Sequence, residues 1–530
     1  MEPEEGERRN GALRWVEIYW PGCAVASGFV ACLLLPVLLG LDDYFLDELY
    51  YLACAGRPAL GYVDHPPLAP LLLGGVRAVL GDSLLALRLL PAACGVATIL
   101  LTARLARIWG AGAHGQLLAS LAVACAPVVL TMSGFFSPNA IELLLWTACW
   151  SALVEISRRD RMRDWLLLGA LLGLGFENKH TAVTLAVAIS FGLLVARGPK
   201  LLRQPGPWAG LAVALALALP NLLFQVQHGW PSLEFYRIAT FTKNISTPPL
   251  EGLIAQAMSM NVATLPLWTA GLGFLCFSRH GARDRAIGWA CAALLVAMLL
   301  SQWSRPDRIM GIYPALFAAG SAWLDTGSGR VAAASRWALT LAILAVGLAL
   351  LPLAVPVLPT EPLASYTRNL QPPPSEKDEG RPSPLPQWLA GRLGWREMAR
   401  EVDRIVRAEL DVPPSDVAIL APSYGHAGAL ELHGRELELP PVYSTHNNYH
   451  LWGPPDQAKR VWIVLGFEAE VLRGWFESVE RAGTIDCEYC NGWRDDLPVW
   501  IARGPKVTWR ELWPDLGYYG NSNRWGRAPD

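Results

Sequence analysis

The side chains best suited to chemistry lie between residues 42 and 68, in the stretch DDYFLDELYYLACAGRPALGYVDHPPL. This stretch follows the first long apolar run, residues 21–41, so Asp47 and Glu48 come just beyond the end of a predicted membrane helix. Two adjacent carboxylates at a membrane edge are costly unless they meet water, a cation or a substrate. A carboxylate can also take a proton from an acceptor hydroxyl or amine. We therefore predict that Asp47 acts as a general base or orients the acceptor, with Glu48 supporting it; the alternative is a solvated loop with a helix N-cap.

Four more side chains of this loop suit binding. Tyr50 and Tyr62 offer aromatic faces that fit sugar rings, and we predict that they bind substrate. Asp64 and His65 precede two prolines, a pattern that also fits a turn beginning a helix. A carboxylate and a histidine could share a divalent ion that neutralises a phosphate, so Asp64 and His228 form a candidate metal pair. The alternative for His228 is a place at a helix end.

Polar and cationic residues recur in the other loops predicted to lie outside the membrane. Asn139 and Glu142 are three residues apart, so they share a face of any helix that begins there. Lysine and arginine can hold a phosphate leaving group and stabilise the charge that develops on it. These residues also have simpler explanations. The lysine can extend its charged end from the membrane to the interface, and the arginine, glutamate and tryptophan side chains can lie at the membrane–water interface without a ligand. We predict that Asn139, Glu142 and Trp230 bind substrate and that Lys179, Arg305 and Arg308 bind a donor phosphate.

The composition indicates a membrane protein with some soluble mass. Of 530 residues, 52% are apolar and only 17% are charged, and the mean hydropathy is +0.28. An ordinary soluble domain has about 25% charged residues. The net charge of −2 argues against a nucleic-acid partner, which would favour a basic face. The N-terminus lacks a clear signal-peptide cleavage pattern, so we interpret the first apolar run as a retained anchor.

Apolar runs of membrane length recur along the chain and predict about eleven transmembrane helices. Alternate loops are short and basic, which places them and the N-terminus (residues 1–20) in the cytoplasm by the positive-inside rule. An odd number of spans then puts the tail on the outer side, together with the first outer loop, residues 42–83. The predicted spans are residues 21–41, 84–103, 116–133, 139–156, 164–177, 180–196, 208–227, 253–277, 285–302, 309–324 and 332–354; the run 66–80 is too short to cross easily.

The tail after the membrane domain (residues 21–355) divides into two parts. Residues 356–388 are rich in proline, serine and charge, which predicts a linker. Residues 389–530 predict a compact α/β domain with helices at 392–409 and 468–479 and strands at 417–420 and 461–465. Among ten cysteines, Cys487 and Cys490 form CEYC, for which a local disulfide and two free thiols both remain open.

Several motifs together resemble one known family. The pattern DE-x-YY followed by GY-x-DHPPL resembles the first outer loop of the bacterial branch of the dolichyl-phosphate-mannose–protein mannosyltransferase superfamily. The segments FFSPNAIELLLWT, GLGFENKHTA and PNLLFQVQHGWPSLEF are similar to later parts of its membrane domain, and YGHAGALELHG and STHNNYHLWGPP to its outer domain. The resemblance implies a GT-C fold: a polytopic helical membrane protein, related to the aminoarabinose transferases of lipid A modification, with an outward-facing active site.

The resemblance also assigns roles to residues. The family transfers a sugar from a polyprenyl monophosphate to an outer acceptor, with inversion at the anomeric carbon. Asp47 matches its catalytic aspartate, and Asp64 falls where the aminoarabinose branch has a metal-binding glutamate. His65 replaces a lysine that contacts the donor phosphate, and Asn139 lies near a second aspartate of some relatives. His65 is thus a predicted donor-phosphate residue, although a neutral histidine is a weaker anion partner than lysine.

The resulting prediction is an inverting glycosyltransferase of the bacterial inner membrane, working as a monomer, with its active site and C-terminal domain in the periplasm. Its partners would be a lipid-linked sugar donor and membrane lipids, with no nucleic acid. A transporter or lipid flippase is the main alternative and would show matched repeats and polar residues at mid-membrane. A structural or assembly protein is the third. The sequence leaves open the sugar, the acceptor (lipid A, another glycan or protein) and the need for a metal.

Overall fold

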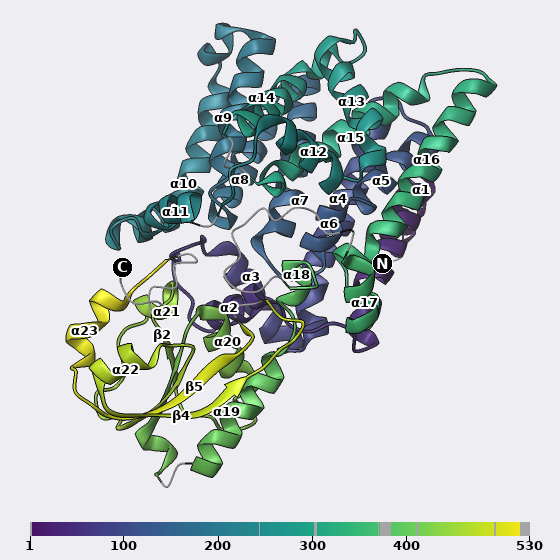
Figure 1. Cartoon of the computed structure of the whole chain (residues 1–530). Helices are drawn as coiled ribbons and strands as arrows, with labels where there is room; N and C mark the ends of the chain where they lie inside the picture. The colour runs from purple at the N-terminus through teal and green to yellow at the C-terminus, as the bar shows by residue number, and fades with distance from the viewer. Residues whose placement is uncertain are drawn as a thin grey trace. The chain divides into compact units, whose positions relative to one another are not determined.

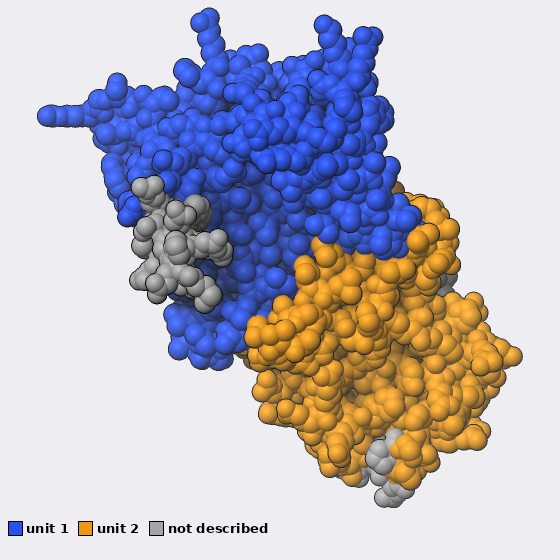
Figure 2. All heavy atoms as spheres, turned by 180° about the vertical axis from the view of Figure 1, so that it is seen from behind, with its two compact units in different colours: residues 1–41, 85–222, 246–358 blue, residues 42–84, 223–245, 359–530 orange. Residues whose placement is uncertain are grey.

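The computed structural model describes residues 3–242, 244–301, 305–368, 370, 383–409, 412–491 and 494–519. The chain divides into two compact units, coloured separately in Figure 2. Unit 1 comprises residues 1–41, 85–222 and 246–358, and unit 2 comprises residues 42–84, 223–245 and 359–530. The loop after the first helix therefore belongs to the same unit as the C-terminal tail.

Unit 1 is built from helices (Figure 1). Helices suit a bilayer because they satisfy every backbone polar group within one segment. The α-helices are α1 (Pro3–Leu38), α4 (Leu84–Ile108), α5 (Ala113–Ala124), α6 (Pro127–Ser133), α7 (Pro138–Arg159), α8 (Met162–Asn178), α9 (Ala182–Arg197), α10 (Pro205–Gln227), α12 (Pro249–Ser259), α13 (Leu265–Phe277), α14 (Arg285–Ser301), α15 (Tyr313–Asp325) and α16 (Arg330–Ala354). Short 3-10 helices are η1 (Pro199–Arg203), η2 (Val262–Thr264), η3 (Ala282–Asp284) and η4 (Pro306–Ile312).

The described helices confirm a multi-pass membrane protein but not the predicted count of eleven spans. Six helices are long and apolar enough to cross a membrane. Two more pairs qualify only when joined: α5 with α6, bent by 65°, and α12 with η2 and α13, bent by 100°. The predicted span at residues 309–324 is not confirmed, because η4 forms its first turn and α15 alone has 13 residues. Thirteen residues rise only about 20 Å, against about 30 Å of hydrocarbon.

Small residues allow the helices of unit 1 to approach closely. A Cβ atom on Gly271 of α13 would lie 1.9 Å from the carbonyl oxygen of Leu316, and one on Gly320 of α15 would lie 2.0 Å from that of Leu267. These two helices are therefore in backbone contact, which larger side chains would prevent. Lipid supplies no hydrophobic drive between helices, so such close packing contributes much of their association.

Unit 2 is a mixed α/β unit (Figure 1). Its helices are α2 (Leu46–Ala55), α3 (Leu68–Leu80), α11 (Pro231–Thr242), α17 (Thr360–Thr367), α18 (Gln387–Ala390), α19 (Trp395–Glu409), α20 (Tyr424–His433), α21 (Asn448–Leu451), α22 (Ala469–Trp475), α23 (Trp509–Leu516) and the 3-10 helix η5 (Pro414–Asp416). Its strands are β1 (Val417–Ala421), β2 (Val442–Ser444), β3 (Val461–Leu465), β4 (Phe476–Ile485) and β5 (Leu497–Pro505).

The five strands form one sheet in the order β2-β1-β3-β5-β4. The first three pair in parallel, and β5 joins β3 and β4 in antiparallel fashion. Every residue of β1 and β3 is buried, as expected for strands covered on both faces, which is why their sequences are uninterrupted apolar runs. The predicted α/β domain and these two strands are thus confirmed.

The predicted helix at 468–479 is wrong in its second half. Helix α22 ends at Trp475, and Phe476 adopts an extended conformation that begins β4. The pairing of β4 with β5 and the burial of Phe476 outweigh the helical spacing of the segment. Within the predicted linker, residues 360–367 form α17, and residues 369 and 371–382 lie outside the described residues.

Cys487 and Cys490 form a disulfide, the first of the two alternatives left open by the sequence. The bridge packs against the backbone of Gly394, where a Cβ atom would lie 2.7 Å from the Cys487 sulfur. Gly394 also has φ of +78°, a conformation that glycine adopts without strain. The CEYC segment is therefore fastened to the turn that precedes α19.

Candidate functional site

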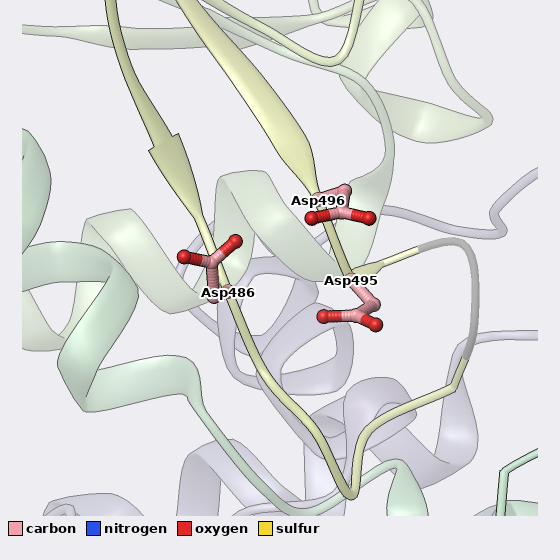
Figure 3. A group of neighbouring side chains, drawn as sticks. All are labelled: Asp486, Asp495 and Asp496. Atoms are coloured by element: carbon pink, nitrogen blue, oxygen red, sulfur yellow. The ribbon is translucent and has the colours of Figure 1, made fainter.

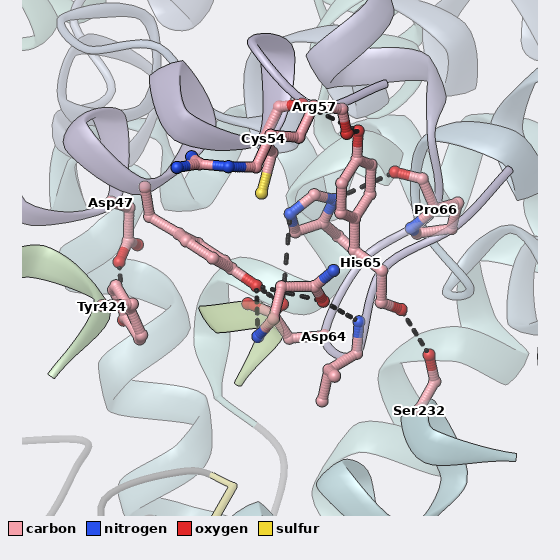
Figure 4. A network of polar contacts seen from close by, with 12 residues as sticks. Asp47, Cys54, Arg57, Asp64, His65, Pro66, Ser232 and Tyr424 are labelled. Atoms are coloured by element: carbon pink, nitrogen blue, oxygen red, sulfur yellow. Dashed lines mark hydrogen bonds and ion pairs between the residues drawn. The ribbon is translucent and has the colours of Figure 1, made fainter. Parts of the chain in front are cut away.

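Unit 2 gathers two carboxylates and their phenol partners into what we call the carboxylate–tyrosine cluster: Asp47, Tyr50, Asp64, Tyr424 and Asn448. Figure 4 shows Asp47, Asp64 and Tyr424 within this network. The Tyr424 hydroxyl donates to Oδ1 of Asp47 at 2.9 Å, and the Tyr50 hydroxyl donates to Oδ1 of Asp64 at 2.8 Å. The rings of Tyr50 and Tyr424 lie 4.6 Å apart between centroids. The predicted catalytic Asp47 and the predicted metal ligand Asp64 thus belong to one network.

Helix α2 carries Asp47 and Glu48 in its first turn, where carboxylates are favoured by the helix dipole. Oε2 of Glu48 accepts the backbone N–H of Phe45 at 2.7 Å, which satisfies the group just before the helix. Glu48 is fully buried, so its side chain holds the start of α2. Glu48 therefore takes part in the helix cap, as the alternative prediction for the pair supposed. Asp47 is the partly exposed member of the pair.

Helix α20 brings Tyr424 to α2 because its glycines allow close contact. A Cβ atom on Gly425 would lie 1.8 Å from Leu46, and one on Gly428 would lie 2.6 Å from the carbonyl oxygen of Leu49. The two glycines of the GHAG segment therefore allow α2 to pack directly against the backbone of α20. This packing joins two segments that are 377 residues apart, counted from Asp47 to Tyr424.

Asn448 fastens the second half of the cluster. Its Oδ1 accepts the backbone N–H of Val63 at 2.6 Å and lies 3.4 Å from the Tyr50 hydroxyl, while its own N–H lies 3.3 Å from that hydroxyl. The chain just before Asp64 is thereby fixed to the tail. The Asp64 side chain keeps 15% exposure, so it can still meet a ligand.

The phenols of the cluster stay protonated. Burial raises the pKa of Tyr424 well above its usual value, and the charges of Asp47 and Asp64 raise it further. Burial, followed by the charge of Asp64, does the same to the pKa of Tyr50. Both hydroxyls therefore act as neutral donors, which orient the carboxylates and favour their ionised form.

His65 and Tyr62 are buried inside the loop. Nδ1 of His65 lies 3.0 Å from the Pro66 carbonyl oxygen, so this nitrogen carries the proton in that contact, and Nε2 lies 4.0 Å from Oδ1 of Asp64. The Tyr62 hydroxyl donates to the Cys54 carbonyl oxygen at 2.9 Å, at the end of α2. Both contacts shape the loop. The buried ring of Tyr62 does not favour the predicted stacking on a sugar, and the phosphate role of His65 stays a prediction.

Trp230 is presented to the surface by a strained turn. Gly229 and Trp230 both have positive φ, +72° and +62°, and this conformation is uncommon for a bulky residue. The turn is held by Ser232, whose hydroxyl accepts from Gln225 at 2.7 Å and donates to the Tyr62 carbonyl oxygen at 3.3 Å. The Trp230 side chain remains 47% exposed. An exposed indole held in this way is available to a sugar or lipid.

The structure does not build a complete metal site around Asp64 and His228. Nδ1 of His228 lies 2.9 Å from the Phe224 carbonyl oxygen, with the two rings stacked. Among the described residues, one group of three potential ligands is found, in the β4–β5 turn region (Figure 3), and it contains neither residue. That group is Asp486, Asp495 and Asp496. The Asp64–His228 metal pair stays a prediction, and no chemical step below passes through it.

Unit 1 gathers the predicted phosphate ligands into a second site, the cation cluster: Lys179, Arg305, Arg308, Asp307 and Glu142. Nζ of Lys179 donates to Oε2 of Glu142 at 2.8 Å, and Arg305 contacts Oδ2 of Asp307 at 3.1 Å. Burial raises the pKa of Asp307, but the charges of Arg305, Lys179 and Arg308 outweigh it, so that the pKa is lowered. All three cations therefore act on one carboxylate.

Helix α7 and the turn after α8 position the lysine. Ser137 caps α7 by accepting the backbone N–H of Asn139 at 3.3 Å, which places Asn139 and Glu142 on the first turns. Lys179 then donates to Oδ1 of Asn139 at 2.6 Å as well as to Glu142. The Thr181 hydroxyl donates to the other Glu142 oxygen. The predicted substrate ligands Asn139 and Glu142 thus orient the lysine.

The 3-10 helix η4 positions the arginines. Nε1 of Trp150 donates to the Gly311 carbonyl oxygen at 2.7 Å, and a Cβ atom on Gly311 would lie 2.6 Å from the Trp146 ring. Both tryptophans belong to α7, so one helix supports both halves of the cation cluster. Lysine and arginine side chains gathered in this way are donors that suit an anionic ligand.

Three members of these sites have no assigned role among the sequence-based predictions. Tyr424 and Asn448 lie in tail motifs that carry only the family resemblance, and Asp307 lies between the two selected arginines. The sequence RPDR could have predicted Asp307, because a carboxylate between two arginines commonly pairs with them. Nothing in the local sequence connects Tyr424 to Asp47, because their contact depends on the packing of α20 on α2.

Comparison with known proteins gives a consistent picture. The family model of dolichyl-phosphate-mannose–protein mannosyltransferases matches residues 64–224. The lipid A galacturonosyltransferase RgtD of Rhizobium johnstonii (strain DSM 114642 / LMG 32736 / 3841) is 25% identical over 209 residues, 39% of this chain and 44% of RgtD. The chain thus matches less than half of that relative's length.

Solved structures extend the likeness to nearly the whole fold. ArnT from Cupriavidus metallidurans bound to undecaprenyl phosphate superposes with a TM-score of 0.61 at 13% identity, over 92% of this chain and 98% of ArnT. In fold, the chain is therefore similar to transferases of the GT-C type. Mycobacterial arabinofuranosyltransferase AftD gives a TM-score of 0.50 at 14% identity, over 91% of this chain and 41% of AftD. These likenesses confirm the predicted resemblance and the predicted fold class, apart from the number of spans.

Proposed function

We propose that this protein is an inverting glycosyltransferase that moves a sugar from a polyprenyl-phosphate donor to lipid A or another envelope glycan. The observation that carries the proposal is the cation cluster, in a chain with the ArnT fold. Lys179 pairs with Glu142 and Arg305 with Asp307, and the charges of Lys179, Arg305 and Arg308, from two distant segments, all act on Asp307. A phosphate leaving group needs such a set of donors. The ArnT structure with undecaprenyl phosphate and the lipid A relative support the donor and acceptor classes.

In the proposed reaction, Asp47 takes the proton from an acceptor hydroxyl as the hydroxyl oxygen attacks the anomeric carbon. The bond between that carbon and the donor phosphate oxygen breaks, and the polyprenyl phosphate leaves with both bonding electrons. Attack from the face opposite the leaving group inverts the anomeric centre. The cations of the cation cluster stabilise the negative charge that grows on the phosphate, while Trp230 offers a face to the sugar or lipid.

The same proposal gives the protein a place in the cell. We take it to work as a monomer in a bacterial inner membrane, with Asp47 and the cation cluster on the periplasmic side. The CEYC disulfide supports an oxidising compartment for the tail.

The test is transfer by the purified protein in lipid nanodiscs. Undecaprenyl-phosphate galacturonic acid serves as the donor probe and lipid A as the acceptor probe, alongside donors with other sugars. We expect mass spectrometry to detect free undecaprenyl phosphate and a lipid A product heavier by one sugar. The proposal is wrong if no donor loses its sugar with any envelope acceptor. Movement of intact donor across a liposome membrane would instead support a flippase.

A further inference from the structure

Tyr424 belongs to the C-terminal domain, yet its hydroxyl is directed at the carboxylate that the proposed reaction uses as a base (Figure 4). We propose that Tyr424 is a positioning residue for Asp47, which makes the C-terminal domain part of the catalytic site. This inference rests on the proposed function.

Three contacts hold Tyr424 in place. Its hydroxyl lies 2.9 Å from Oδ1 of Asp47, and its ring lies 4.6 Å from the Tyr50 ring and 4.7 Å from the His446 ring. Tyr424 is also the first residue of α20, whose glycines fix the distance to α2. A phenol with so little freedom can hold a carboxylate oxygen in one orientation, which is what a general base requires.

The geometry also connects the two carboxylates of the cluster. Tyr424 holds Asp47, Tyr50 holds Asp64, and the two phenol rings are in contact. Asn448, again from the tail, locks the Tyr50 hydroxyl and the backbone before Asp64. The tail thus contacts Asp47 directly through Tyr424 and holds Asp64 indirectly, because Asn448 contacts Tyr50 and the backbone of Val63. A domain that only recognised a partner or covered the membrane domain would not need these two contacts.

The hydrogen bond has a chemical consequence for Asp47. A donor to an ionised carboxylate lowers the pKa of that carboxylate, and its loss raises the pKa. The Asp47 charge acts on Tyr51 of α2 and on Tyr424 of α20, and the Asp64 charge acts on both. Removing the Tyr424 hydroxyl therefore has a predictable direction: the acidic limb of the rate profile should move to higher pH.

The experiment compares Tyr424→Phe with the wild type in the transfer assay, at pH 4.5 to 9. The phenylalanine keeps the ring contacts and loses only the donor. We expect kcat to fall about tenfold to fiftyfold, while KM stays within about twofold of the wild-type value. The midpoint of the acidic limb of the kcat–pH profile should move to higher pH by about half a unit or more. Tyr443→Phe, a sheet residue of the same unit outside the cluster, is the control and should behave as wild type.

A second variant covers the case in which Tyr424→Phe does not fold. Placing 3-fluorotyrosine at position 424 keeps the shape and makes the hydroxyl a stronger donor, so the acidic limb should move to lower pH. A folded Tyr424→Phe protein with wild-type kcat and an unshifted profile, or a fluorinated protein with an unshifted profile, would overturn the inference. If the wild type itself transfers no sugar, the proposed function fails instead, so the two failures are distinguishable.

Discussion

The carboxylate–tyrosine cluster and the cation cluster hold their charged groups in opposite ways. Asp47 and Asp64 are held by neutral phenols, which orient them without cancelling their charge. Lys179 and Arg305 are held by carboxylates, which cancel part of theirs. A neutral donor lowers the basicity of a carboxylate but leaves its negative charge in place to accept a proton. A carboxylate beside a cation instead reduces the repulsion between neighbouring cations before a phosphate binds. The comparison teaches that each cluster is built for the charge it would meet in the proposed reaction.

The largest expected effect comes from removing the carboxylate of the first cluster. Asp47→Asn keeps the oxygen that accepts from Tyr424 but cannot take a proton. We expect transfer to fall about a thousandfold, the range of general base catalysis, with an unchanged melting temperature. Donor release measured by mass spectrometry checks this, with the exposed Asp416→Asn as the control. Retention of more than about a tenth of the activity, or about 1.4 kcal/mol of barrier, would contradict the role of Asp47.

Substitutions in the cation cluster should weaken donor binding more than they slow proton transfer. For Arg308→Gln we expect KM for the donor to rise about tenfold to a hundredfold, because a charged hydrogen bond contributes about 1.5–3 kcal/mol. Arg308→Lys should recover part of this loss, since the charge remains. Arg279→Gln in an exposed loop serves as the control. An unchanged KM in Arg308→Gln would remove this residue from the phosphate site.

A third variant tests whether the first cluster depends on helix packing. Gly428→Ala places a methyl group 2.6 Å from the Leu49 carbonyl oxygen, so α20 must move away from α2. We expect a loss of about 1–3 kcal/mol in stability and a lower kcat, because Tyr424 moves with its helix. The matched control is Gly474→Ala in α22, where the added methyl group meets nothing within 4 Å. Equal melting temperatures for both variants would show that the contact is not tight.

The smallest effect concerns acid sensitivity, in which unit 2 and the cation cluster of unit 1 should differ. Burial, helped by Arg396, lowers the pKa of His433 on α20 to about 4. The unfolded chain binds that proton near pH 6.5, so unit 2 loses stability as the pH falls from about 6.5 towards 4. The free energy of unfolding of His433→Gln should therefore exceed that of the wild type by about 1 kcal/mol at pH 5, allowing for solvent screening. At pH 8 the two should be equal.

The cation cluster should lack this sensitivity at pH 5. Asp307 has a lowered pKa, so its contribution is present above its unfolded pKa of about 3.9 and is lost only as the pH falls through the lower folded value. Thermal melting followed by tryptophan fluorescence at pH 5 and pH 8 checks the difference. A His433→Gln protein whose melting depends on pH as steeply as the wild type would refute it.

Much of the local structure followed from the sequence. The short apolar runs VAIL and VWIVL predicted strands, and both strands are buried along their whole length, as strands covered on both faces are. The spacing of Asn139 and Glu142 predicted a shared helical face, and both contact Lys179. The predictions failed where local pattern competed with long-range pairing: the helical spacing after Trp475 gave way to β4, and apolar runs were counted as spans although bends divide them.

The sequence by itself determined which groups can do chemistry: a DE pair after an apolar helix, and lysine and arginine at the ends of later ones. Those facts need only residue type and spacing. The tertiary structure alone decided that Glu48 caps a helix while Asp47 receives a phenol from a domain 377 residues away. The physical reason is that the close contact between α2 and α20 depends on glycines of α20, whose contact partners lie in a distant segment of the chain. The sequence around a glycine does not show which helix will pack against it.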